Sequence, residues 1–105
     1  MTLHCPESMA SMARYFNALA PETLDQLGDV YSPAVEFKDP MHETRGVSEL
    51  RKVFEHMFQQ LKGVTIQVED AHGDDRTGFL LWTMSYQFRG KPRSITGTSH
   101  LKFAP

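Results

Sequence analysis

The apolar residues in the first part of the chain recur at the spacing of an α-helix. Over residues 7–20, apolar side chains stand three or four positions apart, which is typical of an amphipathic helix that buries one stripe. These side chains are Met9, Met12, Phe16 and Leu19. A second, shorter helix is expected over residues 22–27. Pro21 suits its first position, which needs no backbone N–H, and Gly28 can end it.

The clearest helical pattern lies in the middle of the chain. Ser48 can cap this helix and Gly63 can end it. Its apolar positions, again three or four apart, are Leu50, Val53, Phe54, Met57, Phe58 and Leu61. Before it, residues 35–38 alternate as in a short strand that ends at Asp39, and residues 41–46 are expected to form a loop.

After Gly63 the pattern changes to an alternation that predicts β-strands. Residues 64–69 alternate, and residues 73–75 supply a turn. The longest predicted strand spans residues 77–88, and a turn at residues 89–92 leads to the last one. The last strand is expected to direct one set of side chains to a single face: Ile95, Gly97, Ser99, Leu101 and Phe103. Helices followed by antiparallel strands indicate an α+β domain with helices packed on one face of a sheet.

The composition is that of one folded domain. The 105 residues are 40% hydrophobic and 23% charged, which fits a single core and argues against a disordered chain. A net charge of −2 without any basic block argues against a nucleic-acid partner. The longest apolar run, residues 79–82, is too short to span a membrane, and the first residues carry no signal pattern. We therefore expect a soluble, cytoplasmic protein. The single Cys5, which cannot form an internal disulfide, agrees with a reducing compartment.

Three polar residues are candidates for chemistry. Tyr15 lies on the flank of the first apolar stripe, where its hydroxyl needs a partner. Asp39 ends a strand and is held extended by Pro40, and Ser99 lies among the apolar residues of the last strand. Each has an ordinary structural explanation as a core tyrosine, a turn aspartate or a serine bonded to the backbone. Only their combination favours a functional site.

No metal or cofactor is expected. The histidines form neither a helical pair nor a cysteine–histidine cluster suited to zinc. The sequence has no Gly-rich phosphate loop, nucleophile elbow or catalytic cysteine setting, which argues against kinases, dinucleotide enzymes and α/β-hydrolases. Aromatic and sulfur-containing side chains are plentiful and would either fill the core or line an apolar pocket.

Several short segments share their order and spacing with a known group of proteins. They are Arg14-Tyr15-Phe16, residues 35–40 (Val-Glu-Phe-Lys-Asp-Pro), Gly46, and residues 97–103 (Gly-Thr-Ser-His-Leu-Lys-Phe). In these segments the chain resembles the nuclear transport factor 2-like superfamily, and within it the ketosteroid isomerase and SnoaL-like polyketide cyclase group. The resemblance covers nearly the whole chain. It implies a single SnoaL-like domain over residues 1–105, folded as a conical α+β barrel in which N-terminal helices pack in a strongly curved antiparallel sheet.

The resemblance also implies roles for the three candidates. In ketosteroid isomerases the matching aspartate moves a proton between carbons and the matching tyrosine donates to the enolate oxygen, which would make Asp39 the base and Tyr15 the donor. The second donor of those enzymes is an aspartic acid, where this chain has Ser99. Losing one such donor costs about 10²- to 10³-fold in rate, so steroid isomerisation does not transfer. A base at Asp39 would also need its pKa raised by an apolar pocket.

We therefore expect a pocket that binds a small, largely apolar carbonyl or hydroxyl compound and moves a proton beside the carbonyl, as an isomerase or lyase of this group would. The expected walls of the pocket are Phe54, Phe58, Trp82 and Met84. The alternative is a non-catalytic ligand-binding or oligomerisation module whose own aromatic side chains fill the cone. Convergence of Tyr15, Asp39 and Ser99 on an open cavity would favour the first, and a surface salt bridge from Asp39 to an arginine would favour the second.

A further expectation concerns the end of the chain. Members of the superfamily usually continue past the last motif into another long strand, whereas this sequence stops at Pro105. The resemblance thus implies a domain without the usual last strand, whose sheet has an edge of unpaired backbone groups. Such edges pair readily with another chain. We expect a homodimer or a strand-exchanged assembly through this edge.

Overall fold

The computed structural model describes residues 7–104, so Cys5 and the segment around it lie outside the described residues. The helical segments are α1 (Glu7–Asn17), the 3₁₀ helix η1 (Pro21–Gln26), α2 (Leu27–Val30) and α3 (Val47–Gln60). The strands are β1 (Glu36–Lys38), β2 (Glu43–Arg45), β3 (Lys62–Gly73), β4 (Thr77–Phe88) and β5 (Lys91–Lys102). Among these described helices, none has the length and apolar character needed to cross a membrane.

The three long strands form one antiparallel sheet in the order β3–β4–β5. The β4–β5 hairpin is paired without interruption from Phe88 opposite Lys91 to Thr77 opposite Lys102. Its turn consists of Arg89 and Gly90, which both have positive φ angles of 52° and 76°. Two such residues form the tight turn that matches the natural twist of paired strands.

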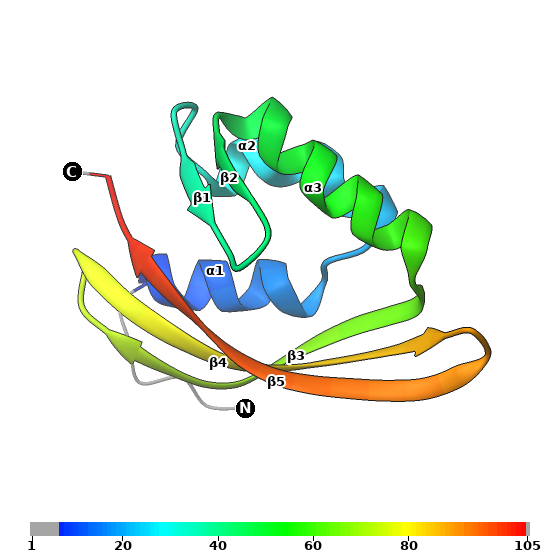
Figure 1. The fold of residues 1–105 in the computed structure, drawn as a ribbon. Coiled ribbons are helices and arrows are strands. Elements are labelled where there is room, and N and C mark those ends of the chain that lie inside the picture. The colour runs from blue at the N-terminus through cyan, green and yellow to red at the C-terminus, as the bar shows by residue number, and fades with distance from the viewer. Residues whose placement is uncertain (1–6, 105) are drawn as a thin grey trace.

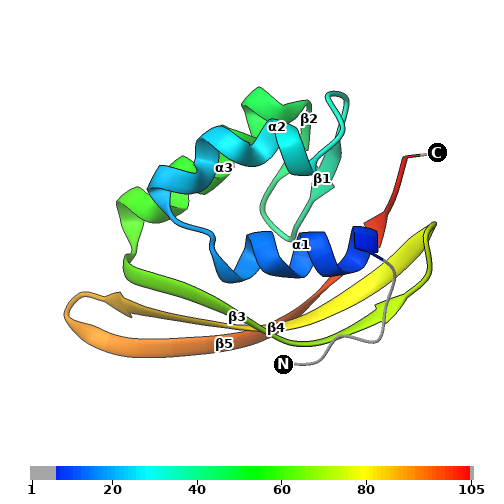
Figure 2. The same ribbon diagram turned by 180° about the vertical axis from the view of Figure 1, so that it is seen from behind.

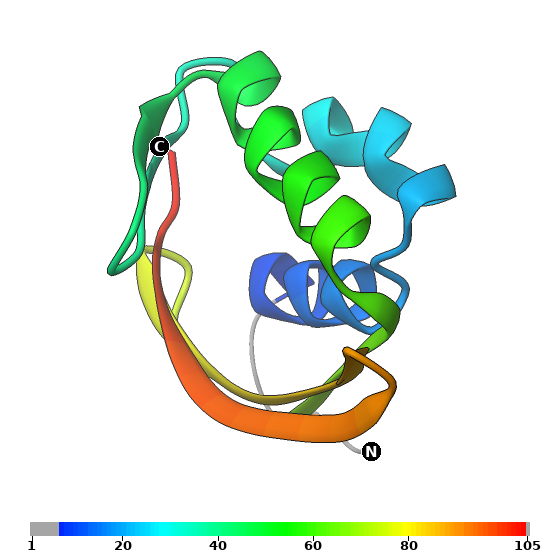
Figure 3. The ribbon, with the colours of Figure 1, turned by 45° about the vertical axis from the view of Figure 1, so that its right-hand side comes forward.

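The sheet is strongly curved, and the helices lie against its concave face (Figure 1; Figure 2 shows the same layers from behind). This arrangement confirms the predicted α+β cone, although the sheet stays open and does not close into a barrel. Strands β1 and β2 pair only with each other. Their hairpin stands apart from the main sheet, beside the C-terminal end of β5 (Figure 3).

The hydrophobic core lies between the helices and the concave face. Its fully buried members come from α1, α2, α3, β3 and β4 and include Met9, Leu27, Leu50, Val68 and Leu80. A hydrogen bond also joins α1 to β3, because Oδ1 of Asn17, at the end of α1, accepts the backbone N–H of Val68 over 2.7 Å. Val68 lies next to an irregular point in the pairing of β3 with β4. Such a bulge leaves backbone groups free to bond elsewhere.

Most predicted elements are confirmed, and the boundaries of the helices differ most. Strand β4 spans residues 77–88 as predicted, whereas α1 ends at Asn17 and not at residue 20. The second helix is not stopped by Gly28 but continues to Val30. Ser48 does not cap α3. The cap is Gly46, whose φ of 91° suits glycine.

The predicted loop over residues 41–46 is wrong, because it contains strand β2. Phe37 of β1 lies opposite Thr44 of β2, and Glu36 opposite Arg45. Only one apolar side chain in this hairpin faces the core, so the alternation that identifies a strand is nearly invisible in the sequence.

Strand β5 forms one edge of the main sheet. The Phe103 N–H donates to the Arg76 carbonyl over 2.8 Å, so the odd-numbered residues of this segment direct their backbone groups toward β4. In an antiparallel pair the neighbouring residues direct theirs away. The groups at the edge therefore belong to the even-numbered residues, among them Ser94, Thr96 and Thr98.

Candidate functional site

Trp82 and Ser99 meet on the concave face of the sheet. Trp82 lies opposite Gly97, and Leu80 opposite Ser99, so all four positions share the face that carries the core. The Trp82 Nε1–H donates to Ser99 Oγ over 2.9 Å. Ser99 keeps its own hydroxyl proton, for which residues 7–104 supply no acceptor. A serine that accepts one hydrogen bond in this way can still donate one to a ligand.

The four predicted wall residues all belong to the core or pack against it. Phe54 and Met84 are buried, whereas Phe58 and Trp82 are half-buried. Phe54 also meets Phe37 of the small hairpin edge to face, with ring centroids 6.0 Å apart. Phe54 is therefore mainly a core residue, whereas Phe58 and Trp82 each keep part of the side chain exposed.

Two exposed apolar residues continue this face toward the β4–β5 turn. Ile95 is 46% exposed and Phe88 is 40% exposed, although both alternate onto the concave side. The hairpin reaches beyond the end of α3 here, so the helices do not cover it (Figure 1). The sequence placed Ile95 on the same face as Gly97 and Ser99 but could not show that the helices end before it.

Tyr15 is buried, and its hydroxyl already has a partner. The phenol donates to the Thr23 carbonyl over 2.9 Å, which links α1 to η1. Burial raises the pKa of Tyr15, and the bond to Thr23 and the charge of Arg51 only partly offset this. To act as the donor for a ligand, Tyr15 would have to give up this bond.

The Asp39 carboxylate accepts hydrogen bonds from the backbone of its own turn and from the side chain of His42. Its Oδ1 accepts the backbone N–H groups of Met41 (2.8 Å) and His42 (2.6 Å). His42 Nδ1 lies 3.0 Å from Oδ1 and 3.2 Å from Oδ2. The partner of Asp39 is thus a histidine, and not an arginine as one of the sequence alternatives supposed.

These contacts set the charge of Asp39. Partial burial raises the pKa of its carboxyl, but the hydrogen bonds from Met41 and His42 outweigh this and leave the pKa below its usual value. The raised pKa that a base at Asp39 requires is therefore absent. Sequence reasoning missed His42 as a site residue, although its position three residues after Asp39, in the turn that follows the Asp-Pro pair, was the available signal.

Asp39 and His42 share the inner face of the small hairpin. Phe37 and Thr44, which lie opposite each other, face the core, while Lys38 and Glu43 are exposed. Asp39 and His42 follow one position further along each strand, and the Asp39 N–H donates to the His42 carbonyl. By alternation their side chains return to the inner side. Thr44 Oγ1 on this side is buried without a hydrogen-bond partner.

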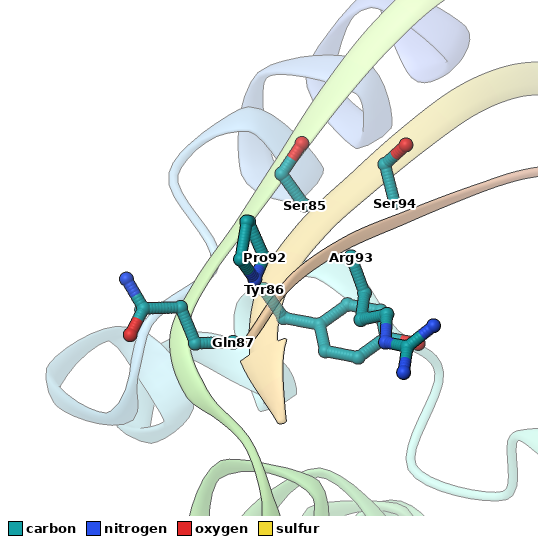
Figure 4. Close-up of a pocket in the computed structure, with 7 residues that line it drawn as sticks. Ser85, Tyr86, Gln87, Pro92, Arg93 and Ser94 are labelled. Atoms are coloured by element: carbon teal, nitrogen blue, oxygen red, sulfur yellow. The ribbon is translucent and has the colours of Figure 1, made fainter. Parts of the chain in front are cut away.

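Two open hollows lie elsewhere on the molecule. One, of about 440 Å³, lies at the β4–β5 turn, where Figure 4 shows Tyr86 and Arg93 together and Ser85 and Ser94 directed away from them. The other, of about 530 Å³, is lined by Asp75, Arg76, Phe103 and Ala104. Neither hollow is lined by Tyr15, Asp39 or Ser99, and no hydrogen bond or ion pair of residues 7–104 joins two of these three.

Residues 7–104 contain no group of three or more His, Cys, Asp and Glu side chains that could hold a metal ion. The polar groups described above on the inner side of the fold are the Ser99 hydroxyl on the sheet and the Asp39–His42 pair on the hairpin.

Solved structures of several proteins share this fold. An LEH-like epoxide hydrolase of M. tuberculosis is 12% identical, with a TM-score of 0.76 over 99% of this chain and 74% of that one. A protein with a ketosteroid isomerase-like fold from Catenulispora acidiphila DSM 44928, in complex with trimethylamine, is 12% identical, with a TM-score of 0.75 over 95% and 78%. An NTF2-like protein from Anabaena variabilis is 14% identical, with a TM-score of 0.66 over 100% and 87%. At these identities the likeness shows the fold alone.

No curated protein matches the chain in sequence. A family model does, and it is the model of the SnoaL-like domain, which matches residues 12–104. This match covers the second half of α1 and the whole of α3 and both sheets. The chain belongs to the SnoaL-like domain family, and its fold is that of ketosteroid isomerase-like and NTF2-like proteins.

Proposed function

We propose that the concave face binds a small, largely apolar compound with a carbonyl or hydroxyl group, and that the site moves a proton beside the carbonyl as an isomerase or cyclase does. The observation that carries this proposal is the Trp82–Ser99 pair. Trp82 holds the Ser99 oxygen from one side, and the serine proton remains available to a ligand oxygen. A donor fixed in this way needs little reorganisation when charge develops on that oxygen.

The surroundings of the pair support an apolar ligand. Phe58 and Trp82 are half-buried, and Ile95 is exposed on the same face. A ligand that covered such side chains would gain about 25 cal/mol for each Å² of apolar surface removed from water. The binding energy would come mainly from these side chains, while Ser99 would orient the ligand.

The base in this proposal comes from the Asp39–His42 pair. Both side chains alternate onto the inner side of the β1–β2 hairpin, which stands beside the C-terminal end of β5 (Figure 3). Ser99 lies on that end of β5. A ligand bound at Ser99 would thus lie between a hydrogen-bond donor on the sheet and a base on the hairpin.

Binding can be tested with the fluorescence of Trp82, because the chain has only one tryptophan. We suggest 2-tetralone, an apolar ketone, as the probe. Ser99→Ala removes one neutral hydrogen bond, so its Kd should rise by about fivefold, equivalent to about 1 kcal/mol. Thr98→Ala, one residue away on the opposite face and exposed, is the matched control. No change in Trp82 emission at saturating ketone would overturn the proposal.

A second candidate function is self-association through the edge of β5. This edge is twelve residues long and has no partner strand in the described chain. An antiparallel pair of two β5 strands about a two-fold axis at Thr96 would place Ser94 opposite Thr98, which brings small polar side chains together. We propose that the chain forms a homodimer through this edge.

A further inference from the structure

The Asp39 carboxylate is poorly placed to remove a proton from a ligand itself. Its Oδ1 already accepts three donors, which are the N–H groups of Met41 and His42 and the ring Nδ1 of His42. Oδ2 is also within 3.2 Å of that ring nitrogen. To act as the base, Asp39 would have to weaken the contacts that close its own turn.

The same contacts define the state of His42. An ionised carboxylate can only accept hydrogen bonds, so the proton between the two groups belongs to His42 Nδ1. The neutral ring then carries its lone pair on Nε2, for which residues 7–104 supply no partner. The ring is partly open, with 38% of the side chain exposed. A carboxylate that fixes the imidazole tautomer in this way prepares the other nitrogen to accept a proton.

We propose that His42 Nε2 is the proton acceptor of the site and that Asp39 is a positioning residue that holds its tautomer and orientation. This inference rests on the proposed function. In the step, a C–H bond beside the ligand carbonyl breaks and an N–H bond forms at Nε2. The electron pair of the C–H bond moves into the enolate, whose oxygen accepts the Ser99 hydrogen bond. The imidazolium then returns the proton to carbon.

The tautomer can be measured without any ligand. Nitrogen-15 spectra of the neutral histidine rings should show His42 protonated on Nδ1. The chain offers an internal reference on the opposite face of the sheet, where His72 bonds to Asp70 through Nε2, 2.8 Å from Oδ2, and should show the other tautomer. In Asp39→Asn the Nε2–H form of His42 should become populated. A wild-type His42 protonated on Nε2 would overturn the inference.

The proton transfer is tested by deuterium exchange of 2-tetralone in D₂O. We expect His42→Gln to slow the enzyme-dependent exchange by about 10²- to 10⁴-fold, the usual contribution of a general base, while Trp82 fluorescence still reports binding. His72→Gln is the matched control and should exchange at the wild-type rate.

The outcomes separate the inference from the proposed function. If His42→Gln exchanges 2-tetralone at the wild-type rate while Asp39→Asn loses this exchange, Asp39 is the base and only the role of His42 is overturned. If the wild type binds the ketone but does not speed its exchange, both the proton transfer and the base are wrong. Loss of exchange in His42→Gln with unchanged binding, together with the Nδ1–H tautomer, would support both.

Discussion

Trp82 occupies the space beside Gly97 that any larger residue would need. A Cβ at position 97 would lie 2.7 Å from both Cη2 and Cζ2 of the indole, and these are atoms of a rigid ring. The Trp82–Ser99 hydrogen bond of 2.9 Å depends on this close approach. Glycine at position 97 is thus part of the site, although it carries no side chain.

Gly97→Ala should displace the indole and break its bond to Ser99. We expect a loss of about 1 to 3 kcal/mol in the free energy of unfolding, as for other overpacked positions, and a shift in Trp82 emission. Urea denaturation followed by fluorescence measures both. Gly28→Ala is the control, because a Cβ at position 28 meets nothing within 4 Å. An unchanged emission spectrum in Gly97→Ala would contradict the packing described.

Tyr15→Phe should affect stability more than function. The substitution removes the hydrogen bond to the Thr23 carbonyl, which should cost about 1 kcal/mol of unfolding free energy. The affinity for 2-tetralone should stay within twofold of the wild-type value, because the phenol is buried and already bonded. A large loss of deuterium exchange into 2-tetralone, without loss of stability, would instead support Tyr15 as the donor predicted from the family resemblance.

Asp39 should make stability depend on pH at the acid end. The pKa of Asp39 is lower in the folded state than in the unfolded chain. At pH values between these two pKa values the unfolded state binds more protons, so stability falls as the pH falls. The contribution of ionised Asp39 to the free energy of unfolding is complete above the unfolded pKa of about 4 and disappears as the pH passes below the folded pKa.

Denaturation curves of the wild type and Asp39→Asn check this expectation. Their difference in unfolding free energy should shrink as the pH falls below about 4. Asp75→Asn serves as the control, because the described structure shows no hydrogen bond to that carboxyl. A constant difference between wild type and Asp39→Asn down to the acid limit would mean that the turn does not stabilise the ionised form.

Thr96→Pro should weaken any dimer formed through β5. The Thr96 N–H points away from β4, so proline there removes an edge donor without breaking the internal ladder. Thr96→Val keeps the N–H and is the matched control. Sedimentation at several concentrations should show a dimer for the wild type and Thr96→Val and a monomer for Thr96→Pro. A wild type that stays monomeric at high concentration would end the self-association proposal.

The long strands and helices were predictable because each buries one face. Over residues 82–88 of β4, apolar inner residues alternate with polar outer ones, and this pattern predicted the strand, although Phe79 and Leu81 nearer its start are apolar and exposed on the outer face. The third helix was equally clear, apart from its cap at Gly46. Strand β2 was not predictable, because its three residues are polar and its pairing with β1 depends on a turn closed by a side chain.

The site was only partly predictable for a related reason. Alternation placed Trp82 and Ser99 on one face, and the structure joins them by a hydrogen bond. The direction of the Tyr15 hydroxyl depends on where η1 passes α1, and no local pattern encodes that. The contact between Asp39 and His42 depends on the shape of a turn whose residues suit many conformations.

The separation of the β1–β2 hairpin from the main sheet implies that it can open on its own. Its strands bond only to each other, and its main contact with the core is Phe37 against Phe54. Short segments with few buried contacts are the first to unfold locally. We expect the amides of residues 36–45 to exchange with solvent well before those of β4, and equal protection would contradict this. Local opening of the segment that carries Asp39 and His42 would then also give a ligand access to the concave face.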